Sequence, residues 1–178
     1  MELLLIRHGE TEESKKGILL GHKHGKLSYT GIMQSKSLAI SLKNEDIDAI
    51  YSSDLKRALQ TSEYIKEFHP DSAFYVDRRL RERNYGIYNG SNFESFLIEY
   101  KDENLTSKPK NGESLLELRK RLEDFYTDII KIYPKDCTLA LISHANSILE
   151  LIKITSNVTI GLERDDIPKN ASLKRVFI

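Results

Sequence analysis

Residues 2–11 read ELLLIRHGET, a short and uniformly apolar run that ends in an arginine, a histidine and a glycine. An apolar run without alternation is typical of a strand that helices cover on both faces. Gly9 lets the backbone turn tightly and come close to a ligand, Arg7 supplies a cation, and His8 is a titratable nucleophile. This stretch therefore predicts a buried strand whose carboxyl end carries functional side chains.

The rest of the chain continues the alternation of apolar strands and helical patterns. Further strands are predicted at Asp48–Ser52, Thr138–Ser143 and Ser172–Ile178. Helices are predicted at Thr30–Lys43, Leu55–Phe68 and Ser114–Ile132, and a short one at Phe93–Lys101 within a loop-rich segment expected to overhang the functional site. The pattern predicts an α/β fold, a three-layer αβα sandwich with a mostly parallel central sheet and helices on both faces. No linker or repeat divides residues 1–178, so one domain is expected.

Two of these helices carry capping signals at their starts. Ser53 and Asp54 offer side-chain oxygens ahead of Leu55, and Ser114 with Glu117 fits a capping box. Both signals place a helix directly after a strand or loop, as the alternation requires.

Composition excludes several classes of protein. Lys and Arg total 27, and Asp and Glu total 27, so no global charge favours nucleic acid or a membrane surface. The single cysteine, Cys137, forms no internal disulfide and agrees with a reducing compartment. The apolar runs are too short to span a bilayer, and Met1-Glu2 begins no signal peptide, so a cytoplasmic location is expected. The oligomeric state is not indicated.

Two more predicted strands end in residues suited to an anion. Arg57 falls in the first turn of a helix, where a positive macrodipole disfavours a cation unless an anion such as phosphate binds there. His144 follows the strand that ends at Ser143. Each alone has another explanation: Arg57 could pair with Asp54 or Glu63 on the surface, and an isolated histidine is more often a satisfied polar residue. Three strand ends of this kind on one edge of the sheet favour a phosphate site.

The ordered motifs resemble the histidine phosphatase superfamily, which includes phosphoglycerate mutases and many small phosphatases. Beyond residues 7–11, the resemblance rests on Gly21 with 27–31, YSSDLKRA at 51–58, LRERNYG at 80–86 with Gly90, and the later segments 112–114, 143–144 and 170–172. It implies that His8 is the nucleophile, that Arg7, Arg57 and His144 surround the transferred phosphoryl group, and that Glu82 is the proton donor. Phosphate and substrate contacts implied by the same motifs are Arg7, Thr11, Ser14, Gly21, Arg57, Tyr85, Ala145 and Asn146.

The chemistry of these residue types agrees with the implied roles. Two arginines and a second, protonated histidine can neutralise the phosphoryl oxygens, so no metal or other cofactor is expected. His8 must attack as a neutral imidazole, and we expect its other nitrogen to bond a backbone carbonyl near Gly9. Glu82 must be protonated when the dianionic ester binds. Without the resemblance, Glu82 would be interpreted as one charge in a solvated surface run.

Some positions depart from the family pattern. Ser14 replaces a common asparagine but keeps a hydroxyl, whereas Leu20 removes a polar side chain. His24 and Lys26 stand where aspartate and proline are common. The cluster 22–26 is therefore either simply solvent-exposed or in contact with an acidic substrate, and both interpretations stay open.

The favoured function is a phosphomonoester phosphatase acting on a small phosphorylated metabolite, with no nucleic-acid or membrane partner. The alternative is a phosphoglycerate mutase primed by 2,3-bisphosphoglycerate, supported by residues 82–86, by His144 with Asn146, and by Ile167-Pro168. Against the mutase, the stretch 100–113 is short and holds lysines but no arginine, so it lacks a bidentate carboxylate grip and a lid. A third hypothesis, a non-catalytic phospholigand-binding module, predicts loss of His8 or Glu82, yet both are present. The substrate itself depends on a variable rim at 91–111.

Overall fold

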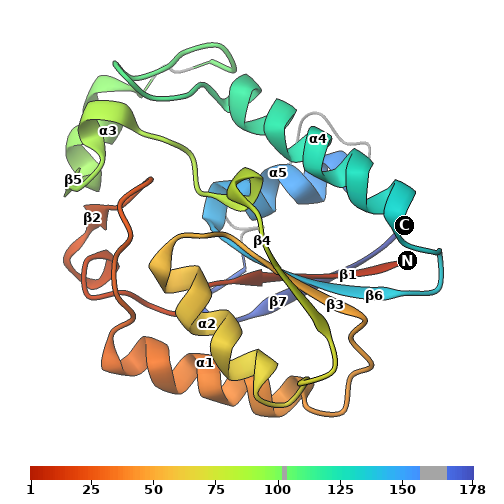
Figure 1. Cartoon of the computed structure of the whole chain (residues 1–178). Coiled ribbons are helices and arrows are strands. Elements are labelled where there is room, and N and C mark those ends of the chain that lie inside the picture. The colour runs from red at the N-terminus through yellow and green to blue at the C-terminus, as the bar shows by residue number, and fades with distance from the viewer. Residues whose placement is uncertain (102–103, 157–167) are drawn as a thin grey trace.

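The computed structural model describes residues 1–101, 104–156 and 168–178 (Figure 1). Its main sheet has the strand order β4-β3-β6-β1-β7. Strands β1, β3, β4 and β6 are parallel, and β7 runs antiparallel to β1 at one edge. The strands span Glu2–Arg7 (β1), Ala49–Ser52 (β3), Ala73–Val76 (β4), Thr138–Ser143 (β6) and Leu173–Phe177 (β7).

Helices cover both faces of this sheet, which confirms the three-layer αβα sandwich (Figure 1). Helices α1 (Tyr29–Leu42) and α2 (Lys56–Lys66) lie on one face, and α4 (Leu115–Ile132) and α5 (Ala145–Thr155) on the other. Within β1, Leu3 and Leu5 pack in the core cluster with α4 and α5, whereas Leu4 and Ile6 pack in the cluster with α1 and α2. Both faces of the strand are thus buried, and this explains its uniformly apolar sequence.

One of the two predicted helix caps is confirmed. The Ser114 hydroxyl accepts a hydrogen bond from the Glu117 N–H, and the Glu117 carboxylate accepts one from the Ser114 N–H. Helix α2 begins one residue later than predicted, at Lys56, and its cap residue Leu55 makes no side-chain bond. Of the two oxygens predicted ahead of it, only the Ser53 hydroxyl bonds the start of this segment, by accepting the Leu55 N–H at 3.3 Å. The Asp54 carboxylate is instead paired with Arg81, at 2.6 Å.

The structure adds elements that the sequence did not predict. Strand β4 widens the main sheet at one edge, and β2 (Ile18–Leu19) pairs with β5 (Ser91–Asn92) in a separate small sheet. Helix α3 (Phe93–Glu99) follows β5 directly and ends two residues before the predicted boundary. Figure 1 shows β2, β5 and α3 grouped together apart from the main sheet. Short 3-10 helices occupy Ser14–Lys16 (η1), Arg78–Leu80 (η2) and Gly86–Tyr88 (η3). No helix in the described ranges is long and apolar enough to cross a membrane.

The turn after β1 lies directly against the start of α1. A Cβ atom on Gly9 would lie 2.5 Å from the carbonyl oxygen of Gly31, and a Cβ on Gly31 would overlap the carbonyl oxygen of Glu10. Two backbones therefore approach each other at a distance that only glycine permits. This contact fixes the position of the residues that follow β1.

Gly31→Ala tests this contact. The added methyl group forces the helix and the turn apart, and we expect the free energy of unfolding to fall by about 2 kcal/mol, as for other overpacked sites. Urea unfolding measures the change. Ser37→Ala, on an exposed position of α1, is the control and should stay within about 0.5 kcal/mol of the wild type. Equal stability of the two variants would contradict a rigid contact.

Candidate active site

Three parallel strands deliver their carboxyl ends to one edge of the sheet. Arg7 is in register with Ser143 in the neighbouring strand β6. Just beyond these ends, the His8 N–H donates to the Ser143 carbonyl at 3.1 Å, and the Ser53 N–H donates to the Ile142 carbonyl at 3.0 Å. The expectation that these strand ends share one edge is confirmed.

His8 is 7% exposed, and both of its ring nitrogens have partners. Nδ1 lies 2.7 Å from the Gly9 carbonyl oxygen, and Nε2 lies 3.1 Å from Nε of Arg57. Because a guanidinium only donates, Nε2 must accept, and the proton therefore sits on Nδ1 and is donated to Gly9. Burial, followed by the charges of Arg57 and Arg7, holds the pKa of His8 well below its ordinary value. The ring is thus neutral, with the Nε2 lone pair toward Arg57, and the predicted backbone bond near Gly9 is confirmed.

Arg57 is fixed by main-chain carbonyls. Its Nη1 donates to Lys23 at 2.6 Å and to His24 at 3.2 Å, and its Nη2 donates to Gly21 at 2.9 Å. The side chain is 2% exposed, so the alternative of a surface ion pair is wrong. Burial lowers the pKa of Arg57 to about 10, and the charge of Glu82 partly offsets this effect. Arg57 therefore remains a cation at neutral pH.

The turn that carries His8 is also held from the strand β7 side. The side-chain amide of Asn170 donates to the His8 carbonyl at 3.0 Å. The Ala171 N–H donates to the carbonyls of Arg7 and His8, at 3.0 and 3.2 Å. Arg7 N–H in turn donates to Ser172. Residues 170–172 thus fix the backbone of Arg7 and His8.

His144 lies beside His8, with the ring centroids 5.0 Å apart. Its Nε2 is 2.9 Å from the Ser53 hydroxyl, which also accepts the Leu55 N–H at 3.3 Å. Because Ser53 needs an acceptor for its own hydrogen, we assign that acceptor as Nε2 and place the His144 proton on Nδ1. Burial and then the charge of Arg57 hold the pKa of His144 well below its ordinary value. Burial and the charge of Arg57 therefore disfavour a protonated His144 as long as no anion is bound beside it.

Two buried donors at this edge have no acceptor within the described parts of the chain. They are Nε of Arg7 and Nδ1 of His144. A buried donor without a partner typically costs about 1–3 kcal/mol. An anion between these groups would supply acceptors for both, and this is the arrangement of an oxyanion site.

Glu82 enters the site from the loop after η2. Its Oε1 accepts from the Arg83 N–H at 2.8 Å, and its Oε2 accepts from the Asn146 N–H at 3.4 Å. Its carbonyl oxygen accepts from His22 Nε2 and Arg121 Nη2, both at 2.9 Å. Burial lowers the pKa values of Arg7 and Arg57, and the negative charge of Glu82 partly offsets this lowering for both. His22 is therefore neither simply exposed nor a pocket residue, because it supports the Glu82 loop.

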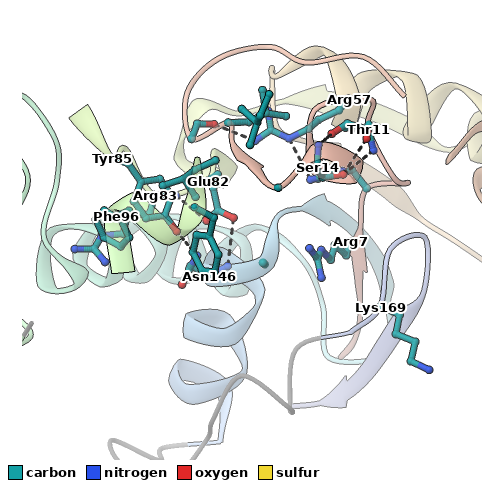
Figure 2. A pocket seen from close by; sticks show the side chains of 18 residues that line it. Arg7, Thr11, Ser14, Arg57, Glu82, Arg83, Tyr85, Phe96, Asn146 and Lys169 are labelled. Atoms are coloured by element: carbon teal, nitrogen blue, oxygen red, sulfur yellow. Dashed lines mark hydrogen bonds between the residues drawn. The ribbon is translucent and has the colours of Figure 1, made fainter. Parts of the chain in front are cut away.

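These groups open into a cavity of about 420 Å³ (Figure 2). Its lining includes every predicted site residue except His144, which is fully buried. Thr11 and Ser14 are joined by reciprocal hydrogen bonds of 3.0 Å, and the Asn146 side chain donates to the Tyr85 hydroxyl at 2.7 Å. The predicted residues in the lining are Arg7, His8, Thr11, Ser14, Gly21, Arg57, Glu82, Tyr85, Ala145 and Asn146.

Part of the lining was not predicted as pocket. Ile18–Leu20 form an apolar trio inside a polar loop, and Phe93 and Phe96 share one side of α3 at a spacing of three. Both patterns were signals that sequence reasoning could have used. Among the described residues of 91–111, only these two phenylalanines line the cavity, and positions 102–103 lie outside the description, as does Ile167. The remaining unpredicted lining residues are Gly17, Arg83 and Lys169.

The ionisable side chains of the described ranges do not cluster as metal ligands. They contain no group of three or more His, Cys, Asp or Glu residues that could hold an ion. The charges that face the cavity come instead from arginine, lysine and one glutamate.

Comparison with known proteins identifies a matching family and several relatives. Residues 3–177 match the model of the histidine phosphatase superfamily (branch 1). A protein of Hydrogenobacter thermophilus provisionally named phosphoserine phosphatase 2 is 31% identical over 168 residues, which cover 90% of this chain and 80% of that protein. A 2,3-bisphosphoglycerate-dependent phosphoglycerate mutase of Bartonella bacilliformis is 28% identical, covering 88% of this chain and 82% of the relative.

A solved structure of a phosphatase has the same fold as this chain. The phosphoserine phosphatase of Entamoeba histolytica, in complex with 3-phosphoglyceric acid, superposes with a TM-score of 0.84 at 27% identity, covering 98% of this chain and 89% of that one. Against three further curated relatives, this chain spans only 50–61% of their length.

Acid should destabilise the protein through its two buried histidines. Their pKa values lie well below 6.5 in the folded protein, so below pH 6.5 the unfolded chain binds protons that the folded one does not. The free energy of unfolding should therefore fall with pH, by roughly 1 kcal/mol per pH unit for each histidine. Urea unfolding at pH 7, 6 and 5 should show a shallower fall for His144→Gln, by roughly that amount. The same pH dependence in both proteins would contradict a buried, neutral His144.

Proposed function

Because this chain belongs to the histidine phosphatase superfamily, we propose that it is a metal-independent phosphomonoester phosphatase that forms a phosphohistidine on His8. The observation that carries the proposal is the state of His8. Its Nδ1 proton is held by the Gly9 carbonyl, which leaves the Nε2 lone pair facing the buried cation of Arg57. A neutral nucleophile next to an anion site is what attack on a phosphate ester requires.

The reaction follows from this geometry in two steps. The ester phosphate binds between Arg7, Arg57 and His144, where its oxygens accept hydrogen bonds from Nε of Arg7 and Nδ1 of His144. They also accept the Nε–H of Arg57, which is bonded to Nε2 of His8 when no phosphate is bound. Nε2 of His8 then forms a bond to phosphorus while the bond to the leaving oxygen breaks, and Glu82, which enters this step as the carboxylic acid, donates its proton to that oxygen and becomes a carboxylate. Glu82 next takes a proton from water, which attacks phosphorus and releases inorganic phosphate and His8.

The dianion also explains how His144 contributes. Neutral His144 donates its Nδ1–H to a phosphoryl oxygen as a hydrogen bond. The negative charge of the ester favours its protonated form, because an adjacent opposite charge raises the pKa of an imidazole. The substrate we propose is a small phosphorylated metabolite, since the cavity has the size of a small-molecule site.

Variants of the two reacting residues test the proposal. We expect His8→Ala to lose at least about 10³-fold in kcat. Glu82→Gln should lose about 10²- to 10⁴-fold with alkyl phosphates and less with p-nitrophenyl phosphate, whose leaving group needs no proton. Glu123→Gln, an exposed position on α4, is the control and should keep full activity. Activity of His8→Ala at the wild-type level, or loss of activity with a chelator, would refute the mechanism.

A mutase is the second candidate, because a mutase is among the relatives. A mutase must shield its phosphohistidine from water and bind a carboxylate. In the described part of 100–113, no residue lines the cavity, and Lys108 is paired with Glu117 at 2.8 Å. These observations favour hydrolysis.

An isomerisation assay separates the two activities. Turnover of 3-phosphoglycerate to 2-phosphoglycerate is followed with and without 2,3-bisphosphoglycerate, and phosphate release from p-nitrophenyl phosphate is measured in parallel. We expect phosphate release that does not depend on 2,3-bisphosphoglycerate, together with isomerisation at background level. Isomerisation that requires 2,3-bisphosphoglycerate and exceeds phosphate release would establish the mutase.

A further inference from the structure

The cavity has two chemically different ends. Figure 2 shows Arg7 and Lys169 on one side and Tyr85, Arg83 and Phe96 on the other. The first side belongs to the phosphoryl site described above. The second side continues into an apolar surface formed by Ile18, Leu19, Leu20, Phe93 and Phe96, called here the apolar wall.

The apolar wall is assembled by main-chain bonds between distant segments. Strand β2 pairs antiparallel with β5, so that Ile18 faces Asn92 and Leu19 faces Ser91. The Gly90 N–H donates to Leu19 at 2.6 Å, and the Phe93 N–H donates to the Gly17 carbonyl at 2.9 Å. These bonds hold β2 beside the first turn of α3. The wall is therefore a fixed part of the fold.

The aromatic part of the wall is packed from behind. Phe96 is 2% exposed and lies edge-on to Tyr85, with ring centroids 4.9 Å apart, and stacks on Tyr100 at 5.0 Å. Phe93, Ile18 and Leu19 remain partly exposed. Phe96 thus supports the wall, and the three partly exposed side chains present apolar surface that a ligand could cover.

Arg83, the cation of the cavity lining that packs on the aromatic part of the wall, is turned toward the protein. The Arg83 guanidinium lies over the rings of Tyr85 and Phe96, at 5.4 and 5.7 Å from their centroids. Its Nε donates to the Glu113 carbonyl at 3.1 Å, and its Nη2 to the Ser107 carbonyl at 3.4 Å. A polar leaving group placed against the wall would lose water without gaining equivalent bonds from its apolar side chains.

We infer that the enzyme selects phosphate monoesters whose alcohol carries an alkyl or aromatic group next to the ester oxygen. A phosphoglycerate carries a carboxylate in that part of the molecule and is therefore expected to be a poorer substrate. This inference rests on the proposed function, because the leaving group reaches the apolar wall when its phosphate is bound at His8. Hydrolysis releases the apolar alcohol and inorganic phosphate, with water as the only co-reactant.

A series of esters tests the selection. Catalytic efficiency, kcat/KM, is measured for methyl, butyl, hexyl and benzyl phosphate and for glycerol 1-phosphate and 3-phosphoglycerate. Each methylene group that reaches the wall should raise kcat/KM about threefold to fourfold. Glycerol is the more acidic alcohol, so leaving-group chemistry works against the expected order. Values that stay level along the alkyl series, or that are highest for the glycerol and glycerate esters, would overturn the inference.

Two variants on the same helix locate the effect. Phe93→Ala removes part of the wall and should lower the ratio of kcat/KM for hexyl over methyl phosphate about tenfold. Ile98→Ala is the matched control, because Ile98 is 77% exposed on α3 and lies outside the cavity lining. Its ratio should equal that of the wild type. An unchanged ratio in Phe93→Ala, or the same loss in both variants, would refute the apolar wall as the selecting surface.

Binding measurements keep this test independent of catalysis. Methyl-, butyl- and hexylphosphonate cannot be hydrolysed, and calorimetry gives their dissociation constants. Progressively tighter binding along the series supports the wall even if no ester is turned over, in which case the proposed phosphatase activity fails alone. Equal affinities along the series, together with hydrolysis of the esters and a phosphohistidine detected on His8, would refute selection by the apolar wall. The proposed phosphatase activity would then stand.

Discussion

The hydrogen bond from Nε of Arg57 to Nε2 of His8 is the interaction on which the site depends. It requires a lone pair on Nε2, and so it fixes the His8 tautomer and directs the other proton to Gly9. It also requires an arginine buried in the first turn of a helix, a position that the macrodipole disfavours. Three carbonyl oxygens from the segment 21–24 hold that arginine. The loop after β2 therefore positions His8 through Arg57, as the strand that precedes His8 does through the main chain.

The charged residues in the loop that carries Glu82 hold that loop in place through ion pairs and hydrogen bonds. From the sequence alone, residues 79–83 resemble a solvated surface segment. In the structure, Arg79 pairs with Asp77 and Asp128, Arg81 pairs with Asp54, and Arg83 is 1% exposed. Arg121 adds bonds to the carbonyls of Arg79 and Glu82 and an ion pair with Glu113. The Glu82 carboxylate is thus positioned because the main chain of its loop is held by hydrogen bonds. The arginines of this run form the ion pairs that keep the loop in place.

Strands β1, β3 and β6 were predictable because a run of apolar residues reports burial directly, and the capping box of α4 was predictable because it is local. The residues predicted as site residues lie together at one edge of the sheet, and all of them except His144 line one cavity. Strands β2 and β5 have two residues each, too few for a period, and they pair across more than 70 positions of sequence. The neutral state of His144 follows from burial beside Arg57, which no sequence pattern records. What was missed therefore depends on contacts between segments that are distant in the chain.

The bonds from residues 170–172 to Arg7 and His8 have a consequence for the order of events during synthesis. Chains emerge from the ribosome with the N-terminal residues first. His8 is made 162 residues before Asn170, and both Asn170 and strand β7, which hold the strand and turn that carry it, are translated later. A nascent chain that stops before residue 170 has β1 without its antiparallel neighbour and a histidine whose carbonyl lacks the Asn170 bond. The backbone position of His8 seen in the structure therefore requires that translation has passed Asn170 and strand β7.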